Sequence, residues 1–512
     1  MQEISRRSFV KKSLVTSAVL TGSGLGASGL LSLSAADNSN LEEKVEKNLS
    51  SIKVSNKNAV RPNIIIINTD DLGYGDLARY GGKAIHTPAI DKLADNGVLF
   101  TNFYACSSLC SPSRFGLLTG RYPQRVGITW PYFSNSQSLK NKFGFGLYRV
   151  LSSLGLMDMG GPNTVDGIPL DEITIPEALR PTGYKTGMVG KWHLGEFPVY
   201  PQYHPLKHGF DFFFGVPHGV DMANNSLYRN EELLAKKIKN PAELTGMYTQ
   251  EAINFIEKSK ESPFFLYFAH TFPHQPHFAS ENFKGKSKGG RYGDTVEEID
   301  WSVEKVMECL EKHQLIDNTL VIFTSDNGPF YHGSPGRLRG RKGESYEGGS
   351  KVPFIAHWPG KIPKGSVCNE PAMNIDFLPT CLALAGTEVP NDRVIDGKNI
   401  WNLMTGADKT TPHKFLCYYH YEELEAIRVG KWKYIRKINS MMSAVPMDKN
   451  WPSAGSRHAP WLHNLETDPD ESYNLREDYP EIAQKMSLMM AHWDKSMQEN
   501  PKGWKQSQAE AN

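Results

Sequence analysis

The chain lacks three features that would each point to a particular class of protein. Its 512 residues include only six cysteines and no Cys-x-x-Cys pair, which argues against a disulfide scaffold and a structural zinc site. Lys and Arg number 57 against 56 Asp and Glu, so no global field favours nucleic acid or a membrane surface as a partner. Recognition of an anion must therefore come from local clusters of charge.

The third missing feature is a long, strongly apolar run. Residues 13–36 are uncharged, but they are rich in Gly, Ser and Ala and only weakly hydrophobic for a spanning helix. Arg6 and Arg7 precede this stretch, and "LSAAD" ends it. The pattern predicts a twin-arginine export signal over residues 1–36, with a membrane anchor as the alternative.

An export signal of this kind implies further expectations. The twin-arginine export machinery of bacteria becomes an expected partner, and the mature protein is expected to be periplasmic or extracellular, without stable membrane insertion. Residues 37–61 are polar and predict a linker.

Apolar runs alternate with helix-like segments over several hundred residues. Strands are predicted at 63–68, 184–190, 263–270 and 319–326, and an amphipathic helix is predicted at 295–313. This alternation predicts an α/β domain over 62–408, with a large, mostly parallel sheet flanked by helices.

The pattern of predicted strands and helices changes after residue 408. Residues 414–438 predict antiparallel strands with a turn at "RVGKW", and 477–497 predict a closing helix. We expect a smaller α+β subdomain with an antiparallel sheet at 409–503, and a disordered tail at 504–512.

Polar residues follow each of the four predicted strands at once. In chain order they are Asp70 and Asp71, Lys191 and His193, His270 and His274, and Asp326 and Asn327. Ligands of open α/β sheets bind beyond the carboxyl ends of the strands, so these side chains predict a site. Three carboxylates and an amide suit Ca²⁺ or Mg²⁺, although turns and helix caps use the same residues.

The stretch "CSPSR" places Cys110 at the expected start of a helix that Gly120 ends. The free N–H groups there favour an anion, and Arg114 lies one helical turn further on. Buried packing and a disulfide to Cys106 are the alternatives for this cysteine.

These residues carry a resemblance to a known family. "CSPSR" followed by "LLTG" resembles the sulfatases, within the alkaline phosphatase-like superfamily, where this pentapeptide is the recognition sequence for oxidation of cysteine to formylglycine. "NTDDLGYGD", "GKWHLG", "SDNG", "YEGG" and "LHNLETDPDESYNL" recur in that family in this order. The stretch at 203–221 resembles the arylsulfatase A and N-acetylgalactosamine-6-sulfatase branch.

The resemblance implies a cofactor and a maturation step. A maturation enzyme would convert Cys110 to formylglycine, which would complete the shell of one Ca²⁺ ion. The other implied ligands of that ion are Asp70, Asp71, Asp326 and Asn327.

The resemblance also implies catalytic roles. Arg114 and Lys191 match residues that hold formylglycine and sulfate, His193 matches the histidine beside the formylglycine hydroxyl, and Lys342 matches a second substrate-side cation. His274 best matches the histidine that reaches the bridging oxygen, although His270 and His277 lie close by. One hydroxyl of the hydrated aldehyde would attack sulfur, and deprotonation of the other would release sulfate.

The expected substrate is a sulfated carbohydrate, either a polysaccharide or a glycosaminoglycan fragment, with a lean to galactose-type sugars. His218 and Asp221 are candidate sugar-binding residues, and Trp130 or Tyr132 are candidates for stacking on a ring, although each also fits an ordinary loop. A phosphatase or phosphodiesterase on the same fold and a non-catalytic binder of sulfated glycans are the competing functions.

Overall fold

Four successive isoleucines form the core of strand β1 (Asn63–Thr69), in which every residue is buried. β-Branched side chains favour this pleated, buried conformation. The computed structural model describes residues 52–54, 61–133, 163, 165–222, 225–438 and 459–505. The other predicted central strands are confirmed as β4 (Lys185–Lys191), β8 (Phe264–Ala269) and β9 (Thr319–Ser325).

The main sheet has ten strands in the order β11-β2-β10-β9-β1-β8-β4-β5-β6-β7. Its central strands β9, β1, β8, β4 and β5 run parallel, and β10, β6 and β7 are antiparallel to their neighbours. The further strands of this sheet are β2 (Val98–Phe100), β5 (Phe212–Val216), β6 (Leu227–Arg229), β7 (Glu232–Ala235), β10 (Phe354–His357) and β11 (Ser366–Cys368). β3 (Phe103–Tyr104) and β12 (Ala372–Met373) pair in a separate two-stranded sheet. The predicted α/β fold with a mostly parallel sheet is therefore confirmed.

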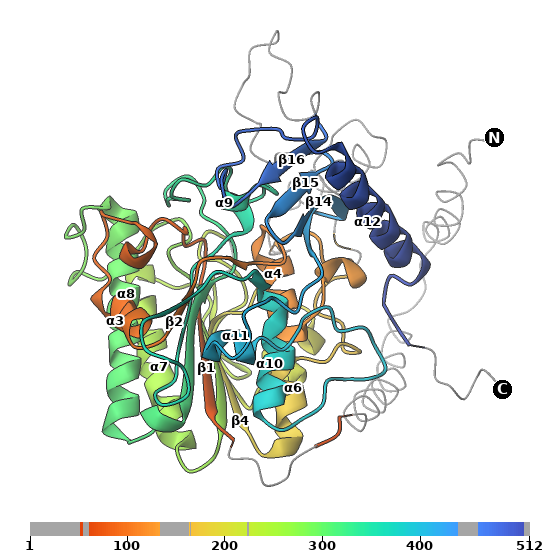
Figure 1. Cartoon of the computed structure of the whole chain (residues 1–512). Coiled ribbons are helices and arrows are strands. Elements are labelled where there is room, and N and C mark those ends of the chain that lie inside the picture. Colours follow the sequence, from red (N-terminus) through yellow and green to blue (C-terminus); the bar gives the residue numbers. More distant parts are fainter. Residues whose placement is uncertain are drawn as a thin grey trace, which may run out of the picture. The chain divides into compact units, whose positions relative to one another are not determined.

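Helices cover both faces of this sheet (Figure 1). One layer consists of α3 (Pro88–Asp95), α7 (Leu244–Ser259) and α8 (Gly290–Lys312). This layer packs with Ile65 and Ile67 of β1. The other layer consists of α4 (Cys110–Thr119), α6 (Ile175–Leu179), α10 (Phe377–Leu384) and α11 (Trp401–Thr405). It packs with Ile64 and Ile66 of β1. The period-2 alternation of β1 thus supplies both cores.

A smaller antiparallel sheet follows in the chain. Its strands are β13 (Leu416–His420), β14 (Glu423–Val429), β15 (Trp432–Ile435) and β16 (Trp461–Asn464), and α12 (Pro480–Glu499) packs on it (Figure 1). Its core also contains Tyr104, Tyr346 and Met373 from the earlier part of the chain. The small sheet therefore shares a hydrophobic cluster with the loops and short strands above the main sheet.

The described segments near both ends of the chain contact the loops that follow α10. Ile52 is buried, Val54 pairs with Thr387, and the Lys53 carbonyl accepts a hydrogen bond from Glu388 N at 3.0 Å. Trp504 pairs with Arg393, so ordered chain continues into the predicted tail. The predicted export signal and most of the predicted linker lie outside the described residues. Within the part of the chain that the structure describes, no helix has both the length and the apolar character to span a membrane.

Candidate active site

The carboxyl ends of three parallel strands deliver the predicted ligands to one edge of the main sheet. Asp70 and Asp71 follow β1, Asp326 and Asn327 follow β9, and Lys191 ends β4. The Asp71 backbone N–H donates to Asp326 Oδ1 at 3.2 Å, which joins two of these strand ends directly. Asp71 has φ of 67°, a left-handed conformation that L-residues adopt rarely and that is concentrated at functional sites.

Cys110 is the first residue of α4, as predicted, and Gly120 ends this helix in a left-handed conformation. The Cys110 Sγ lies 3.1 Å from Lys342 Nζ and 4.0 Å from Asp71 Oδ1. Burial raises the pKa of the Cys110 thiol well above its usual range, although Lys342 and Lys191 oppose the shift. The unmodified side chain is thus a neutral thiol, and a neutral thiol is a weak nucleophile.

Both thiols near the helix start are free, which contradicts the alternative of a Cys106–Cys110 disulfide. The Cys106 sulfur points along α4 instead, 3.9 Å from the Pro112 carbonyl oxygen. Gly116 makes room for it, because a Cβ at that position would meet this sulfur at 2.2 Å.

Two buried ion pairs place cations between the carboxylates. Lys191 Nζ contacts Asp70 Oδ2 at 2.5 Å. Arg114 donates from Nε to Asp326 Oδ2 at 2.9 Å and from Nη1 to the Lys191 carbonyl at 2.8 Å. All four side chains are essentially inaccessible to solvent. Anionic and cationic side chains thus alternate in contact with one another at this edge of the sheet.

The carboxylates differ in their affinity for protons. Burial alone would raise the pKa of Asp70, but Lys191, His274 and Arg114 together hold it well below its usual range. Burial and the charge of Asp70 raise the pKa of Asp326 to about 7, against the effect of Arg114. Two close carboxylates shift apart in this way because the charge of one disfavours ionisation of the other.

Several oxygens and other donor atoms at this edge suit a cation. Asp70 Oδ1 and Asn327 Oδ1 are buried and accept no hydrogen bond in the structure. Ligand atoms of Asp70, Asp71, Cys110 and His274 lie within 4.8 Å of one another. Buried oxygens of this kind are costly unless they are bonded, and hard divalent cations bind carboxylate and amide oxygens. The residues therefore fit a divalent cation.

Lys342 joins the same cluster from a distant loop. Its Nζ donates to both oxygens of Asp71, at 2.6 and 2.8 Å. Burial alone would lower the pKa of Lys342, but Asp71 and Cys110 hold it well above its usual range. The structure thus places Lys342 as a buried cation beside Cys110 rather than as a solvated loop charge.

His193 has a defined orientation. Its Nε2 lies 2.7 Å from the carbonyl oxygen of Tyr132, while its Nδ1 is buried without a hydrogen-bond partner. A carbonyl only accepts, so Nε2 carries the hydrogen and Nδ1 carries the lone pair when the ring is neutral. Burial, with the charge of Lys191, holds the pKa of His193 well below its usual range. The ring is therefore a neutral base at pH 7.

Among the histidines after β8, His274 is the one that faces the cluster. Its Nε2 lies 3.7 Å from Asp71 Oδ2, and its Nδ1 contacts the Gln275 carbonyl at 2.6 Å. His270 is buried against Phe268, and His277 packs on Tyr292 and His332. This geometry selects His274 from the three neighbouring candidates.

The predicted sugar-binding residues are divided. The His218 ring lies 5.7 Å from that of His193, and both of its nitrogens are buried without hydrogen-bond partners. Asp221 is exposed at the end of the same loop. Tyr132 is buried and its hydroxyl donates to the Val165 carbonyl at 3.2 Å, so its ring packs inside the protein. Trp130 packs on Tyr421, with ring centroids 4.4 Å apart.

Sequence reasoning missed the contacts that hold these side chains. The Tyr132 carbonyl, which orients His193, gives no signal in a sequence because any residue supplies a carbonyl. Tyr292, the third residue of α8, donates a 2.5 Å hydrogen bond to Asp76 and lies 3.4 Å from the Asp71 carbonyl. Asp76 stands in the motif "NTDDLGYGD", which was the available signal.

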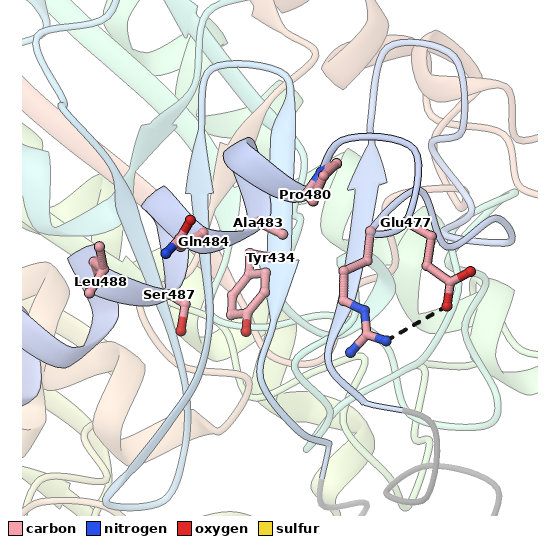
Figure 2. Close-up of a pocket in the computed structure, with 8 residues that line it drawn as sticks. Tyr434, Glu477, Pro480, Ala483, Gln484, Ser487 and Leu488 are labelled. Atoms are coloured by element: carbon pink, nitrogen blue, oxygen red, sulfur yellow. Dashed lines mark ion pairs between the residues drawn. The ribbon is translucent and has the colours of Figure 1, made fainter.

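Two other features lie away from this cluster. Glu257, Cys309 and His313 bring potential metal-ligand atoms together, but Lys312 and His313 already contact the Glu257 carboxylate at 3.2 and 3.0 Å. A shallow hollow of about 570 Å³ lies between β15 and α12 (Figure 2). Tyr434, Arg476 and Leu488 are among the residues that line it, and none of the predicted site residues does so.

The fold and this cluster together define a hydrolase that acts on an anionic ester. Buried cations surround the start of α4, a neutral base lies beside them, and a cation-binding set of oxygens closes the edge of the sheet. This is the arrangement expected for the alkaline phosphatase-like superfamily, and comparison with known proteins identifies the family within it.

The chain belongs to the sulfatase family, whose sequence model matches residues 62–387. A second model, described as N-sulphoglucosamine sulphohydrolase, C-terminal, matches residues 341–496. N-acetylgalactosamine-6-sulfatase of Canis lupus familiaris is 39% identical over 395 residues, which cover 73% of this chain and 71% of that protein. The protein is thus a sulfatase, an enzyme that hydrolyses sulfate esters.

Solved structures agree with this family. A structure from a study of glycosaminoglycan metabolism by Bacteroides thetaiotaomicron is 29% identical, with a TM-score of 0.71, and covers 85% of this chain and 99% of that chain. A sulfatase from Pseudoalteromonas sp. is 26% identical, with a TM-score of 0.72, and covers 90% of this chain and 95% of that chain.

Proposed function

We propose that this sulfatase removes sulfate from sulfated carbohydrates, using formylglycine formed from Cys110 and one bound Ca²⁺ ion. The observation that carries the proposal is the setting of Cys110, at the start of α4 and 3.1 Å from Lys342 Nζ. A neutral thiol there has little use as a nucleophile, whereas the hydrated aldehyde supplies a hydroxyl that can attack sulfur and a second hydroxyl that allows sulfate to leave.

Asp70, Asp71, Asp326 and Asn327 would hold the calcium ion, with the modified Cys110 completing its shell. The buried, unbonded oxygens of Asp70 and Asn327 support this assignment. The bound ion would supply positive charge beside the nucleophile and the sulfate group.

The chain's own cations prepare the site for a sulfate ester. Arg114, Lys191 and Lys342 are buried around Cys110, and burial strengthens their attraction for an anion. Arg114 is fixed by Asp326 and by the Lys191 carbonyl, so it is oriented before substrate enters.

Two histidines are placed for opposite proton transfers. His193 accepts a proton at Nδ1, because its Nε2 hydrogen is committed to the Tyr132 carbonyl. His274 presents Nε2 toward the cluster, because its Nδ1 donates to the Gln275 carbonyl. The bridging oxygen of the departing sugar would take its proton from the Lys342 ammonium, or from His274 Nε2 when that atom carries a hydrogen.

The proposed substrate class rests on the similarity of this chain to named sulfatases and on the expected export of the protein from the cytoplasm. One relative is named N-acetylgalactosamine-6-sulfatase, after a sulfated galactose-type sugar. This name favours glycosaminoglycan-type substrates that contain such sugars. His218, buried beside His193, is proposed to contact a sugar hydroxyl, and exposed Asp221 is proposed to do so at the mouth of the site.

The test combines maturation and activity in one preparation from the native host. We expect the peptide that contains Cys110 to carry an aldehyde that reacts with a hydrazide probe. We also expect sulfate release from chondroitin 6-sulfate oligosaccharides, with little phosphate release from a matched panel of phosphate esters. Cys110→Ala should abolish both signals, whereas Cys368→Ser, a half-buried thiol on β11, should keep them. An intact thiol in active protein, or phosphate release that exceeds sulfate release, would refute the proposal.

We also propose that residues 1–36 direct twin-arginine export to the periplasm or beyond. Replacing Arg6 and Arg7 with Lys should leave matured enzyme in the cytoplasm, as measured by fractionation and by the hydrazide probe. Unchanged export of the double variant would show that the sequence is a different kind of signal.

A further inference from the structure

Exposed cations from two separate loops and from the first turn of α8 lie at the start of this helix. They are Lys83, Lys286, Lys288 and Arg291, and we refer to them as the basic patch. The loops meet at Ile85, because a Cβ on Gly289 would lie only 2.8 Å from Ile85 Cγ1. His86 adds a further contact, its backbone N–H donating to Glu297 Oε1 on α8 at 3.2 Å.

The loop that carries most of the basic patch has a fixed backbone. The buried carboxylate of Asp294 accepts hydrogen bonds from the backbone N–H groups of Gly285, Lys286 and Ser287 at 2.7, 3.1 and 2.9 Å. The carboxylate thus fixes the main chain while the lysine side chains stay exposed. Lys284 of this loop forms an ion pair with Glu281. Among the described residues, none forms a salt bridge with any of the four cations of the basic patch.

Like charges held together on an ordered loop repel one another, so the arrangement raises the local positive potential. An anionic partner relieves this repulsion. Several cations spaced along two loops and the first turn of α8 suit a partner that carries repeated negative charges better than one that carries a single anion.

The basic patch adjoins the catalytic cluster through Tyr292. Arg291 directly precedes Tyr292, so their Cα atoms are about 3.8 Å apart. The Tyr292 hydroxyl lies 3.4 Å from the Asp71 carbonyl oxygen. His277, on the same loop as His274, packs on the Tyr292 ring with centroids 5.5 Å apart. The patch therefore lies on the side of the site where His274 would meet the departing sugar.

We propose that the basic patch binds further sulfate groups of a sulfated polysaccharide whose reacting sulfate lies at Cys110. The inference rests on the proposed function. A chain that extends from the departing sugar passes His274 and His277 and reaches Arg291, and its next anionic groups then meet Lys288, Lys286 and Lys83. The patch distinguishes a polymer from a small sulfate ester, because a small ester ends before it reaches these residues.

The test compares two triple variants with the same change in charge. Lys286→Gln, Lys288→Gln and Arg291→Gln remove patch cations, whereas Arg476→Gln, Lys485→Gln and Lys495→Gln remove exposed cations near or on α12. Equal charge changes cancel the effect of net charge on steering. Sulfate release is measured with chondroitin 6-sulfate polymer and with an aryl sulfate, and thermal unfolding checks folding.

We expect the patch variant to lose roughly tenfold in kcat/KM on the polymer relative to the aryl sulfate, since each exposed charge contact contributes modestly. The loss should shrink at high salt, where exposed charges are screened. The control variant should keep the wild-type ratio. Equal losses on both substrates, or a polymer loss matched by the control variant, would overturn the proposal.

A separate binding arm keeps this inference distinct from the proposed function. Retention on immobilised dextran sulfate is measured by the salt concentration that elutes each protein, which requires no turnover. Earlier elution of the patch variant than of the control supports the basic patch even if wild-type enzyme hydrolyses no tested sulfate. Identical elution of the two variants overturns the patch, whatever the activity.

Discussion

Replacing Lys433 with Met should destabilise the protein strongly, because it would leave two buried carboxylates without their shared cation. Lys433 Nζ lies 3.0 Å from Glu347 Oε1 and 2.8 Å from Glu471 Oε1, and all three side chains are at most 1% exposed. Removing one partner of a buried ion pair costs about 3–5 kcal/mol, because the remaining charge is buried and uncompensated. We expect a loss of unfolding free energy of that order.

The dependence on pH gives this prediction a second signature. Burial raises the pKa of Glu471 to about 7, against the charge of Lys433, while Lys433 and its neighbours hold the pKa of Glu347 at about 2 although burial opposes them. The raised carboxyl of Glu471 stabilises the wild-type protein below its unfolded pKa, near 4.3, and this stabilisation is lost as pH rises through 7. Without Lys433, both carboxyl pKa values rise. The folded variant then binds extra protons, and its deficit against wild type shrinks as pH falls from 8 to 5.

The assay is urea unfolding of wild type, Lys433→Met and Lys431→Met at pH 8 and pH 5. Lys431 is a matched control, because it lies two positions away, is 44% exposed and reaches Glu466 only at 4.0 Å. Its replacement should change stability by less than about 1 kcal/mol. A Lys433→Met protein as stable as the Lys431→Met protein, or one whose deficit grows at pH 5, would refute this reasoning.

Three further predictions follow from the site and the sheet. His193→Gln should lower kcat by about 10²–10⁴-fold, because it removes the Nδ1 base, and His193→Gln activity within tenfold of wild type would exclude that role. Adding Ca²⁺ at about 100 times its Kd should stabilise the wild-type protein against thermal unfolding by about 2.7 kcal/mol. Asp326→Asn should abolish this stabilisation, and equal stabilisation of both proteins would show that Asp326 is not a ligand of the ion. Gly190→Ala should prevent soluble expression, because its Cβ would lie 1.8 Å from the Ala269 oxygen on β8. Gly246→Ala, within α7, meets no atom within 4 Å and should be tolerated; equal soluble yields would contradict this.

The central strands and the strand-end residues could be predicted because each is coded locally. The isoleucine run of β1 predicts a doubly buried strand, and the polar residues that follow each central strand must meet if the strands are parallel. Parallel pairing itself was inferred only from the alternation of strands and helices. The structure confirms it, and the consequence is the contact between Asp71 and Asp326.

The supporting contacts could not be predicted because their partners are remote in the chain and ordinary in type. Glu347 and Lys433 are 86 residues apart, and neither stands in a pattern that pairs it with the other. The orientation of His193 depends on a backbone carbonyl 61 residues away. Burial decides both cases, and burial of a charged side chain is the property that sequence patterns report least well.

The position of Lys342 depends on the small sheet as well as on its own loop. The N–H of the next residue, Gly343, donates to the Ser108 carbonyl at 3.0 Å, and the Gly343 carbonyl contacts His420 Nδ1 at the end of β13 at 3.0 Å. A few residues further on, Glu347 meets Lys433 of β15. Because these contacts come from the small sheet on one side and from the approach to Cys110 on the other, the small sheet takes part in building the active site. A substitution in β15 can therefore change catalysis through Lys342, although its residues contact neither Cys110 nor the carboxylates at the edge of the main sheet.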